Sequence, residues 1–300
     1  MHGFSGSCRL ALFSVAFAGQ APGRTIRISD DKLPIYTIIC ALYREASVVN
    51  NLVAAIRALD YPPEKLDVKF VVEADDRDAR RALAELDLGP PFAIITAPPI
   101  GSRTKPKALN VALPFARGSF TVAYDVEDVP EPDQLRRAFN AFMATDERLA
   151  CLQASLTIDN TTDSWLARMF TASYAGQFDA LLPGLAALHL PLPLGGSSNH
   201  FRTTALRQAG GWDPYNVTED ADLGICLHRL GYRSATCRPP PMRRRRRVSG
   251  HGSGNARAGT RAGYKHGSSI CAARGVWCES SRLSARWPFS SSSPATFSRH

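Results

Sequence analysis

Carboxylates beside aromatic residues and glycines make residues 195–233 the stretch of this sequence best suited to chemistry. Its acids fall within ten positions, close to two aromatic residues: Asp213, Glu219, Asp220 and Asp222, with Trp212 and Tyr215. An aromatic ring can lie against a polar ring, and a carboxylate can remove a proton from a hydroxyl on it. The structural alternative is an acidic turn that starts a helix over 221–230, with Thr218 as its N-cap.

Further polar clusters follow short apolar runs along the chain. They are Tyr43 and Glu45 after the first run, Glu73, Asp75 and Asp76 after the second, Asp125, Glu127 and Asp128 after the fourth, and the lysines of KPKALN, Lys105 and Lys107. Mg²⁺ and Mn²⁺ take one or two carboxylates and complete their shell with phosphate and water. Lysines at a helix N-terminus suit a diphosphate. Any single pair is equally consistent with a surface ion pair, but the whole set predicts a metal–diphosphate site.

The elements that would position these residues alternate between strands and helices. Strands are predicted at 36–42, 69–72, 92–96, 120–124 and 149–156, and helices at 46–59, 76–88, 107–115 and 131–145. This alternation predicts an α/β fold with a doubly wound, mostly parallel sheet. In such sheets ligands bind beyond the carboxyl ends of the strands, so the polar clusters should meet at one edge.

The ordered set of motifs resembles glycosyltransferase family 2, in a bacterial branch similar to the cellulose-synthase-like membrane enzymes. The resemblance covers residues 33–236 and rests on these segments: PIYTIICALYRE, VVEADD, KPKALN, YDVED, GGSSNHFR and GGWDPYNVTEDADLG. It implies a GT-A-type fold, with a mostly parallel sheet and helices on both faces. It also implies one catalytic domain at 31–237. Residues 1–30, with only a short apolar run, are expected to be poorly ordered.

The resemblance implies a role for each candidate residue. The nucleotide-sugar donor is expected to bind at Tyr43, Glu45, Glu73, Asp75, Asp76, Lys105 and Asp125. Asp125 and Glu127 are expected to hold Mg²⁺ or Mn²⁺, although Asp128 is an alternative to Glu127. Catalysis is assigned to Asp220, as general base, and to its neighbour Glu219. Attack of the deprotonated hydroxyl opposite the leaving diphosphate implies inversion at the anomeric carbon.

The acceptor is expected to be a glycan or a lipid, and the donor a UDP-sugar. His200 and Trp212 are expected to line the acceptor channel, with core packing as an equal alternative for Trp212. A nucleotidyltransferase is the competing enzyme class, but residues 41–45 lack the glycine-rich phosphate loop expected of it. A non-catalytic nucleotide-sugar-binding remnant would retain every one of these motifs.

Location is also inferred from the resemblance. Full-length relatives are integral to the inner membrane and act on its cytoplasmic side, and this chain is expected to be peripheral to that membrane or soluble. Seven scattered cysteines fit a reducing compartment. The apolar run at 10–18 is too short to span a bilayer. The leucine-rich segment 175–194 contains three prolines, which exclude one continuous spanning helix. It is expected to lie at the membrane face, to cover the acceptor channel, or to form a buried helix-turn-strand connection.

The family pattern stops after Cys237. The resemblance predicts a Glu-Glu-Ala-Pro segment, a Gln-x-x-Arg-Trp motif that holds the acceptor and diphosphate, and membrane helices, none of which occurs in 238–300. That tail carries 13 Lys and Arg and one acid, a net charge of +12, whereas residues 1–237 carry −3. We expect it to be disordered.

Codons permitted for residues 242–267, read one nucleotide earlier, encode Glu-Glu-Ala-Pro and then Gln-Arg-Thr-Arg-Trp. The tail is therefore interpreted as out-of-frame translation, and the chain is expected to have little or no transferase activity. A basic arm that binds RNA or lipid is the alternative, and no nucleic-acid partner is expected.

Overall fold

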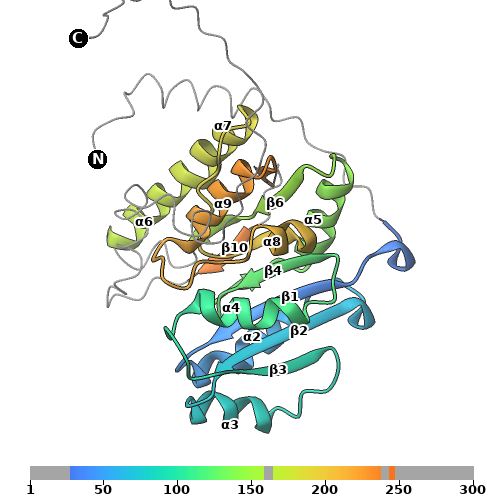
Figure 1. Cartoon of the computed structure of the whole chain (residues 1–300), viewed down its shortest axis with the longest axis vertical. Coiled ribbons are helices and arrows are strands. Elements are labelled where there is room, and N and C mark those ends of the chain that lie inside the picture. The colour runs from blue at the N-terminus through green and yellow to red at the C-terminus, as the bar shows by residue number, and fades with distance from the viewer. Residues whose placement is uncertain (1–27, 159–164, 238–242, 247–300) are drawn as a thin grey trace, which may run out of the picture.

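A seven-stranded sheet forms the centre of the structure, a computed structural model that describes residues 28–158, 165–237 and 243–246 (Figure 1). The strand order is β3-β2-β1-β4-β8-β6-β9. Their bounds are β1 Tyr36–Leu42, β2 Leu66–Glu73, β3 Phe92–Ala97, β4 Phe120–Tyr124, β6 Leu149–Gln153, β8 Asn199–Arg202 and β9 Arg233–Thr236. Only β8 runs antiparallel to its neighbours. The predicted mostly parallel sheet is confirmed.

Helices cover both faces of this sheet. The α-helices are α2 Val49–Arg57, α3 Arg77–Glu85, α4 Lys105–Ala112, α5 Gln134–Met143, α8 Thr203–Gln208 and α9 Glu219–Arg229. Short 3-10 turns lie at Asp30–Lys32, Ala46–Val48, Pro63–Lys65 and Leu113–Phe115. Apolar residues of α2, α3 and α5 pack in one core, and those of α4, α8 and α9 in a second. The four predicted helices are thus present, each somewhat shorter than expected.

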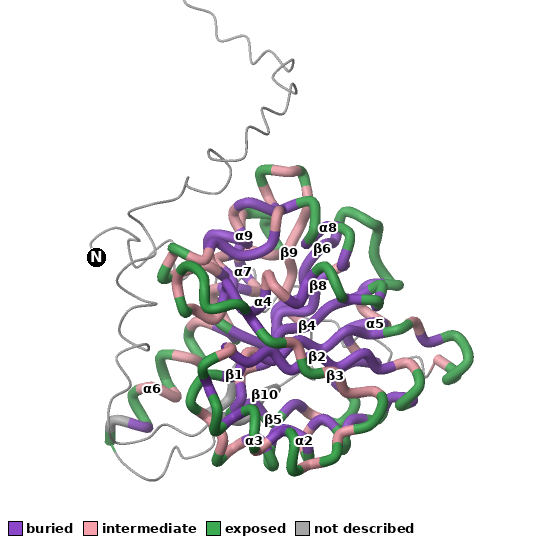
Figure 2. Tube along the Cα trace, turned by 60° about the horizontal axis from the view of Figure 1, so that its bottom comes forward, coloured by how far each residue is buried: buried purple, intermediate pink, exposed green. Residues whose placement is uncertain are grey.

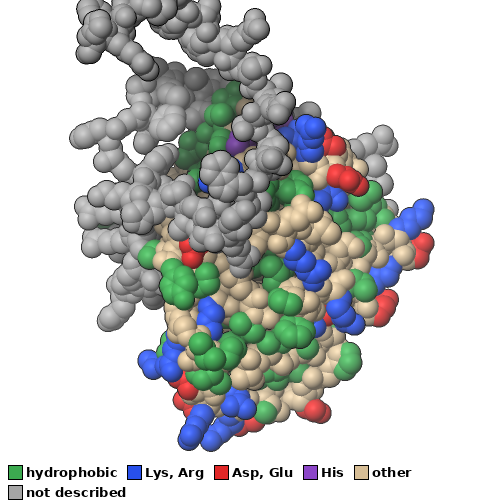
Figure 3. Space-filling model, in the orientation of Figure 1, with side chains coloured by type: hydrophobic (Ala, Val, Ile, Leu, Met, Phe, Trp, Pro, Cys, Tyr) green, Lys and Arg blue, Asp and Glu red, His purple; other side chains and the backbone are tan. Residues whose placement is uncertain are grey.

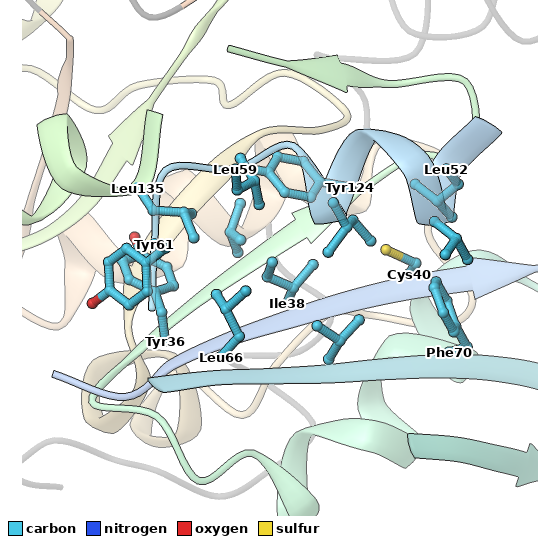
Figure 4. Close-up of a cluster of buried hydrophobic side chains, with 14 of the residues drawn as sticks. Tyr36, Ile38, Cys40, Leu52, Leu59, Tyr61, Leu66, Phe70, Tyr124 and Leu135 are labelled. Carbon is cyan, nitrogen blue, oxygen red and sulfur yellow. The ribbon is translucent and has the colours of Figure 1, made fainter. Parts of the chain in front are cut away.

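Strand β1 contributes side chains to both cores. Tyr36, Ile38 and Cys40 belong to the first core, whereas Ile39 belongs to the second. Figure 4 shows part of the first core, where Leu52 of α2 lies close to Cys40. Because side chains alternate along a strand and both faces are covered, the whole strand reads as an apolar run. Figure 2 shows this burial through the centre of the sheet.

A small second sheet corrects two expectations. It consists of β5 Val129–Pro130, β10 Arg243–Arg246 and β7 Ser155–Ile158, with β10 in the middle. The single strand predicted at 149–156 is therefore two strands, because Ala154 N–H donates to Ser198 O (3.1 Å) and the chain then leaves the main sheet. Residues 243–246, expected to be disordered, form a strand, since backbone pairing does not require apolar side chains. The other tail residues, and 1–27, lie outside the described residues.

The leucine-rich segment begins as a helix and passes through a turn towards β8, in line with the expected helix-turn-strand connection. Helix α6 (Trp165–Ala175), a π-helical segment (Gly176–Leu181) and α7 (Leu182–Ala187) follow one another directly. Pro183 is the second residue of α7, directly after the π-helical segment. Among the described residues, no helix is both long and apolar enough to cross a bilayer.

On the face shown in Figure 3, acidic and basic side chains of the described residues are interspersed over the lower part of the molecule. This mixture agrees with the small net charge of residues 1–237, −3. Over that lower part, the described residues offer a polyanion no extended basic patch.

Candidate active site

The predicted polar clusters meet at the carboxyl edge of the sheet. Strands β1, β2 and β4 are parallel neighbours, so the residues that follow them share one edge. Lys105 Nζ, at the start of α4, donates to Asp125 Oδ1 (2.5 Å) and to Gly196 O. A Cβ placed on Gly196 would lie 3.8 Å from Asp220 Oδ2. The glycine loop therefore brings the expected diphosphate residue Lys105 close to the expected base Asp220.

The three acids at the end of β2 have different surroundings. Glu73 is 4% exposed, and both its oxygens accept from Lys107 Nζ (3.2 and 3.0 Å). Asp76 accepts from Arg44 N (2.6 Å) and caps α3 through Ala79 N (3.1 Å). Asp75 forms an ion pair with Arg103 (2.7 Å), and both of these side chains are more than 40% exposed. Asp75 is thus the most accessible of the three, whereas Asp76 holds the loop that follows β1.

Loss of the Lys107 ammonium should destabilise the fold. The variant K107M leaves the Glu73 carboxylate buried without its cation, which we expect to lower the free energy of unfolding by roughly 2–3 kcal/mol. Urea denaturation followed by circular dichroism measures the change. The matched control is R103M, which breaks the exposed pair with Asp75 and should cost at most about 1 kcal/mol. Equal effects in both variants would show that the buried pair has no special role.

The turn after β4 distinguishes the two candidates for the second metal ligand. Asp128 is 1% exposed, and its Oδ2 accepts from Asp125 N (2.8 Å) and from Ser197 Oγ. Glu127 is exposed. Asp128 thus shapes the turn, which favours Glu127 as the ligand.

These residues fit a divalent cation that also takes phosphate oxygens. The Lys105 ammonium against Asp125 shows that a positive group is stable there. Burial, followed by the charges of Asp125 and Glu127, raises the pKa of Glu45, so a third carboxylate faces the same pair. In the part of the chain that is described, no three His, Cys, Asp or Glu side chains form a ready metal cluster. One or two carboxylates are nevertheless sufficient for Mg²⁺ beside phosphate.

The acids at the start of α9 are partly or wholly buried. Asp220 is 5% exposed, and its Oδ1 accepts from Trp212 Nε1 (2.9 Å). Thr218 stands at the N-cap position, but its hydroxyl donates to Asn216 Oδ1 (3.1 Å) and makes no side-chain cap. Burial and the charge of Asp220 raise the pKa of Glu219 to about 7, against the opposing effect of Lys105. A buried carboxyl with a raised pKa beside a second carboxylate suits acid–base work.

The raised pKa of Glu219 predicts a pH dependence of stability. The folded chain binds this proton more tightly than the unfolded chain, whose glutamate has a pKa near 4.5. Stability should therefore fall as the pH rises from about 4.5 to about 7, by on the order of 3 kcal/mol. The variant E219Q should remove this part of the slope in urea denaturation between pH 5 and pH 8. E85Q, at an exposed glutamate of α3, is the control, and an unchanged slope in E219Q contradicts the prediction.

The two residues expected in the acceptor channel are both buried. His200 is 0% exposed and shares a 2.8 Å hydrogen bond with the Tyr36 hydroxyl through Nδ1, and burial lowers its pKa to about 3. A neutral imidazole inside the core has no access to an acceptor, which corrects that expectation. Trp212 is 1% exposed and packs edge-on against Phe201. Its core-packing alternative therefore holds, combined with the bond to Asp220.

Sequence reasoning missed the residues that fix the loops of the site. Gln153 Oε1 accepts from Gly195 N (2.6 Å), and its Nε2 donates to Ser197 O (3.1 Å). Asn110 bonds both backbone groups of Trp212. Asn110 is the last residue of the KPKALN segment. Nothing in the sequence indicates that it bonds Trp212, a residue 102 positions away.

The chain is similar in sequence to known glycosyltransferases. A family model described as Glycosyltransferase like family 2 matches residues 34–252. A probable glucomannan 4-beta-mannosyltransferase of Arabidopsis thaliana is 25% identical over 221 residues, covering 71% of this chain and 40% of the relative. A beta-monoglucosyldiacylglycerol synthase of Synechocystis is 26% identical over 218 residues, covering 70% and 43%. The chain thus spans less than half the length of these relatives.

Solved structures of similar fold support the fold expected from the resemblance. A mannosyltransferase from Pyrobaculum calidifontis in complex with GDP-Man and Mn²⁺ matches with a TM-score of 0.60 at 20% identity, over 84% of this chain and 71% of that one. S. aureus TarS 1-349 in complex with UDP-GlcNAc matches with a TM-score of 0.55 at 15% identity, over 74% and 60%. The GT-A-type fold is thereby confirmed.

Proposed function

Because the chain belongs to the Glycosyltransferase like family 2, we propose that its carboxyl-edge site binds a nucleotide-sugar and transfers the sugar, with inversion, to a hydroxyl of a glycan or lipid. The observation that supports this most is the arrangement around Gly196. Its carbonyl accepts from Lys105, and its Cα faces Asp220. A group that stabilises a leaving diphosphate and a group that accepts a proton thus lie on either side of one loop.

In this proposal the donor binds first. Tyr43, Glu45, Glu73, Asp75 and Asp76 surround the nucleoside, and the Lys105 ammonium neutralises the diphosphate. Asp125 and Glu127 hold Mg²⁺ or Mn²⁺, which when bound supplies positive charge that stabilises the departing diphosphate. One of the structures of similar fold is in complex with GDP-Man and the other with UDP-GlcNAc, and we propose UDP for this chain.

Asp220 then accepts the proton of the acceptor hydroxyl. The hydroxyl oxygen forms its bond to the anomeric carbon as the bond from that carbon to the diphosphate oxygen breaks, and the electron pair leaves with the diphosphate. Burial and the charge of Asp220 raise the pKa of Glu219, so Glu219 keeps its proton to a higher pH than an ordinary glutamate. The hydrogen bond from Trp212 favours the ionised form of Asp220. Asp220 is therefore the member of the pair ready to act as a base.

Binding and turnover of nucleotide-sugars test this function. Isothermal titration of the full chain with UDP, GDP and their sugars, with and without Mn²⁺, should show one nucleotide binding more tightly with the cation. Release of nucleoside diphosphate from the donor, with a glycan or diacylglycerol present, measures turnover. Absence of binding by every nucleotide at millimolar concentration would overturn the proposal. Binding without turnover would instead identify the chain as a nucleotide-sugar-binding remnant.

We also propose that the tail after residue 237 is out of frame. Resequencing codons 230–300 from fresh genomic DNA should restore a frame that reads through Gln-Arg-Thr-Arg-Trp into apolar segments. The restored protein would then be active at the cytoplasmic face of the inner membrane. An unchanged frame refutes this proposal and leaves the basic tail as part of the protein.

A further inference from the structure

We propose that Asn110 and Trp212 are positioning residues, which fix the carboxylate of Asp220 relative to Lys105. This inference rests on the proposed function, because it assigns Asp220 the role of base. Neither residue is expected to touch the reacting atoms. Their effect is exerted through hydrogen bonds that link α4 to the start of α9.

Asn110 holds the backbone of Trp212 from both sides. Asn110 Nδ2 donates to Trp212 O (2.5 Å), and Trp212 N donates to Asn110 Oδ1 (2.9 Å). The preceding Gly211 makes this approach possible, since a Cβ there would lie 2.3 Å from Asn110 Oδ1 and its φ is +74°. A two-point bond of this kind fixes both the position and the direction of the peptide group.

The indole ring extends this arrangement to the base. It is 1% exposed and stands at 90° to the Phe201 ring, with the centroids 5.8 Å apart, so it has one orientation. Its Nε1 donates to Asp220 Oδ1 at 2.9 Å. Asp220 Oδ2 lies on the side of Gly196, 3.8 Å from the place of a Cβ on that glycine. The Trp212 bond therefore fixes how the Asp220 carboxylate is turned relative to the loop at Gly196.

Helix α4 connects the hydrogen bonds of Asn110, Trp212 and Asp220 to the part of the site expected to bind the donor. Lys105 begins the helix and bonds Asp125, and Asn110 lies five residues further along the same helix. The helix backbone is rigid over such a length. One element thus sets the position of both the diphosphate-binding ammonium and the base, and a fixed separation of the two is what an in-line displacement requires.

Tryptophan N–H resonances test this arrangement without any need for turnover. The chain has four tryptophans, and ¹⁵N-labelling of that residue gives four indole signals at most. W212F identifies the Trp212 signal by its loss, and W165F, at an exposed tryptophan of α6, is the matched control. We expect the Trp212 signal to move upfield in D220N, and to move or broaden in N110A but not in N51A, at an exposed position of α2. A signal unmoved by D220N and N110A would overturn the inference.

Kinetics separate positioning from general damage to the fold. W212F keeps an aromatic ring beside Phe201 but removes the N–H donor together with part of the ring volume, so turnover of the nucleotide-sugar should fall about 10–100-fold while its Kd stays within about twofold. N110A should give the same pattern. A parallel loss of donor affinity, or unchanged turnover, contradicts the inference. If the native chain shows no turnover, the proposed sugar transfer by this chain is refuted. The indole resonances still test whether Asn110 and Trp212 hold Asp220 by these hydrogen bonds.

Discussion

The variant D220N should lower sugar transfer about 10³-fold and leave nucleotide affinity unchanged. A general base typically contributes 10²–10⁴-fold, and asparagine keeps the size of the side chain while losing the ability to accept a proton. Because Trp212 Nε1 can still donate to the amide oxygen, the loop should stay in place. Release of nucleoside diphosphate over long incubations measures the effect, in this chain or in the frame-restored protein.

The matched control is D213N, in the same segment. Asp213 is 6% exposed and accepts from Tyr215 N (3.0 Å), a role that asparagine can also fill. Its turnover should stay close to that of the native chain. If D220N loses donor affinity as much as turnover, Asp220 holds the donor and is not the base. If D220N remains active, the base is another group, and Glu219 is then the first candidate.

The sequence predicted those strands and helices whose own residues show an apolar pattern typical of the element. Strand β1 is buried on both faces, so its seven residues are almost all apolar and its bounds were predicted correctly. Strand β8 gives no such signal, because its four residues, NHFR, include three polar ones. It lies between β4 and β6, and that position depends on partners far away in the sequence.

The position of His200, like that of β8, depends on strands far away in the sequence, whereas the position of the acids does not. The acids were predicted to gather at one edge because parallel strands align their carboxyl ends, which needs only the order of elements. His200 was misplaced because a motif does not say which face of a strand a side chain takes. In β8, register with Val122 and Leu152 turns His200 into the core beside Tyr36. A shift by one residue would have reversed that orientation.

Replacing Asp125 should have the second large effect, on the cation. In D125N the carboxylate that bonds Lys105 becomes neutral, so the site loses a charged ligand for Mg²⁺ or Mn²⁺. We expect Mn²⁺ to stop strengthening nucleotide binding, and turnover to fall about 10²–10³-fold, as when a group that stabilises transition-state charge is removed. Titration of the nucleotide with and without Mn²⁺ measures the first effect, and electron paramagnetic resonance of free Mn²⁺ provides an independent count of bound ions.

Two neighbouring variants then determine which acid completes the cation site. E127Q should weaken Mn²⁺ binding and leave thermal stability unchanged, because Glu127 is exposed. D128N should lower thermal stability and leave Mn²⁺ binding unchanged. Asp128 is buried, and it accepts hydrogen bonds from Asp125 N and Ser197 Oγ in the turn. The reverse result, with Mn²⁺ binding lost in D128N alone, would show that the turn opens when the donor binds and that the buried aspartate is the ligand. Loss of binding in neither variant would leave Asp125 with phosphate and water as the whole coordination shell.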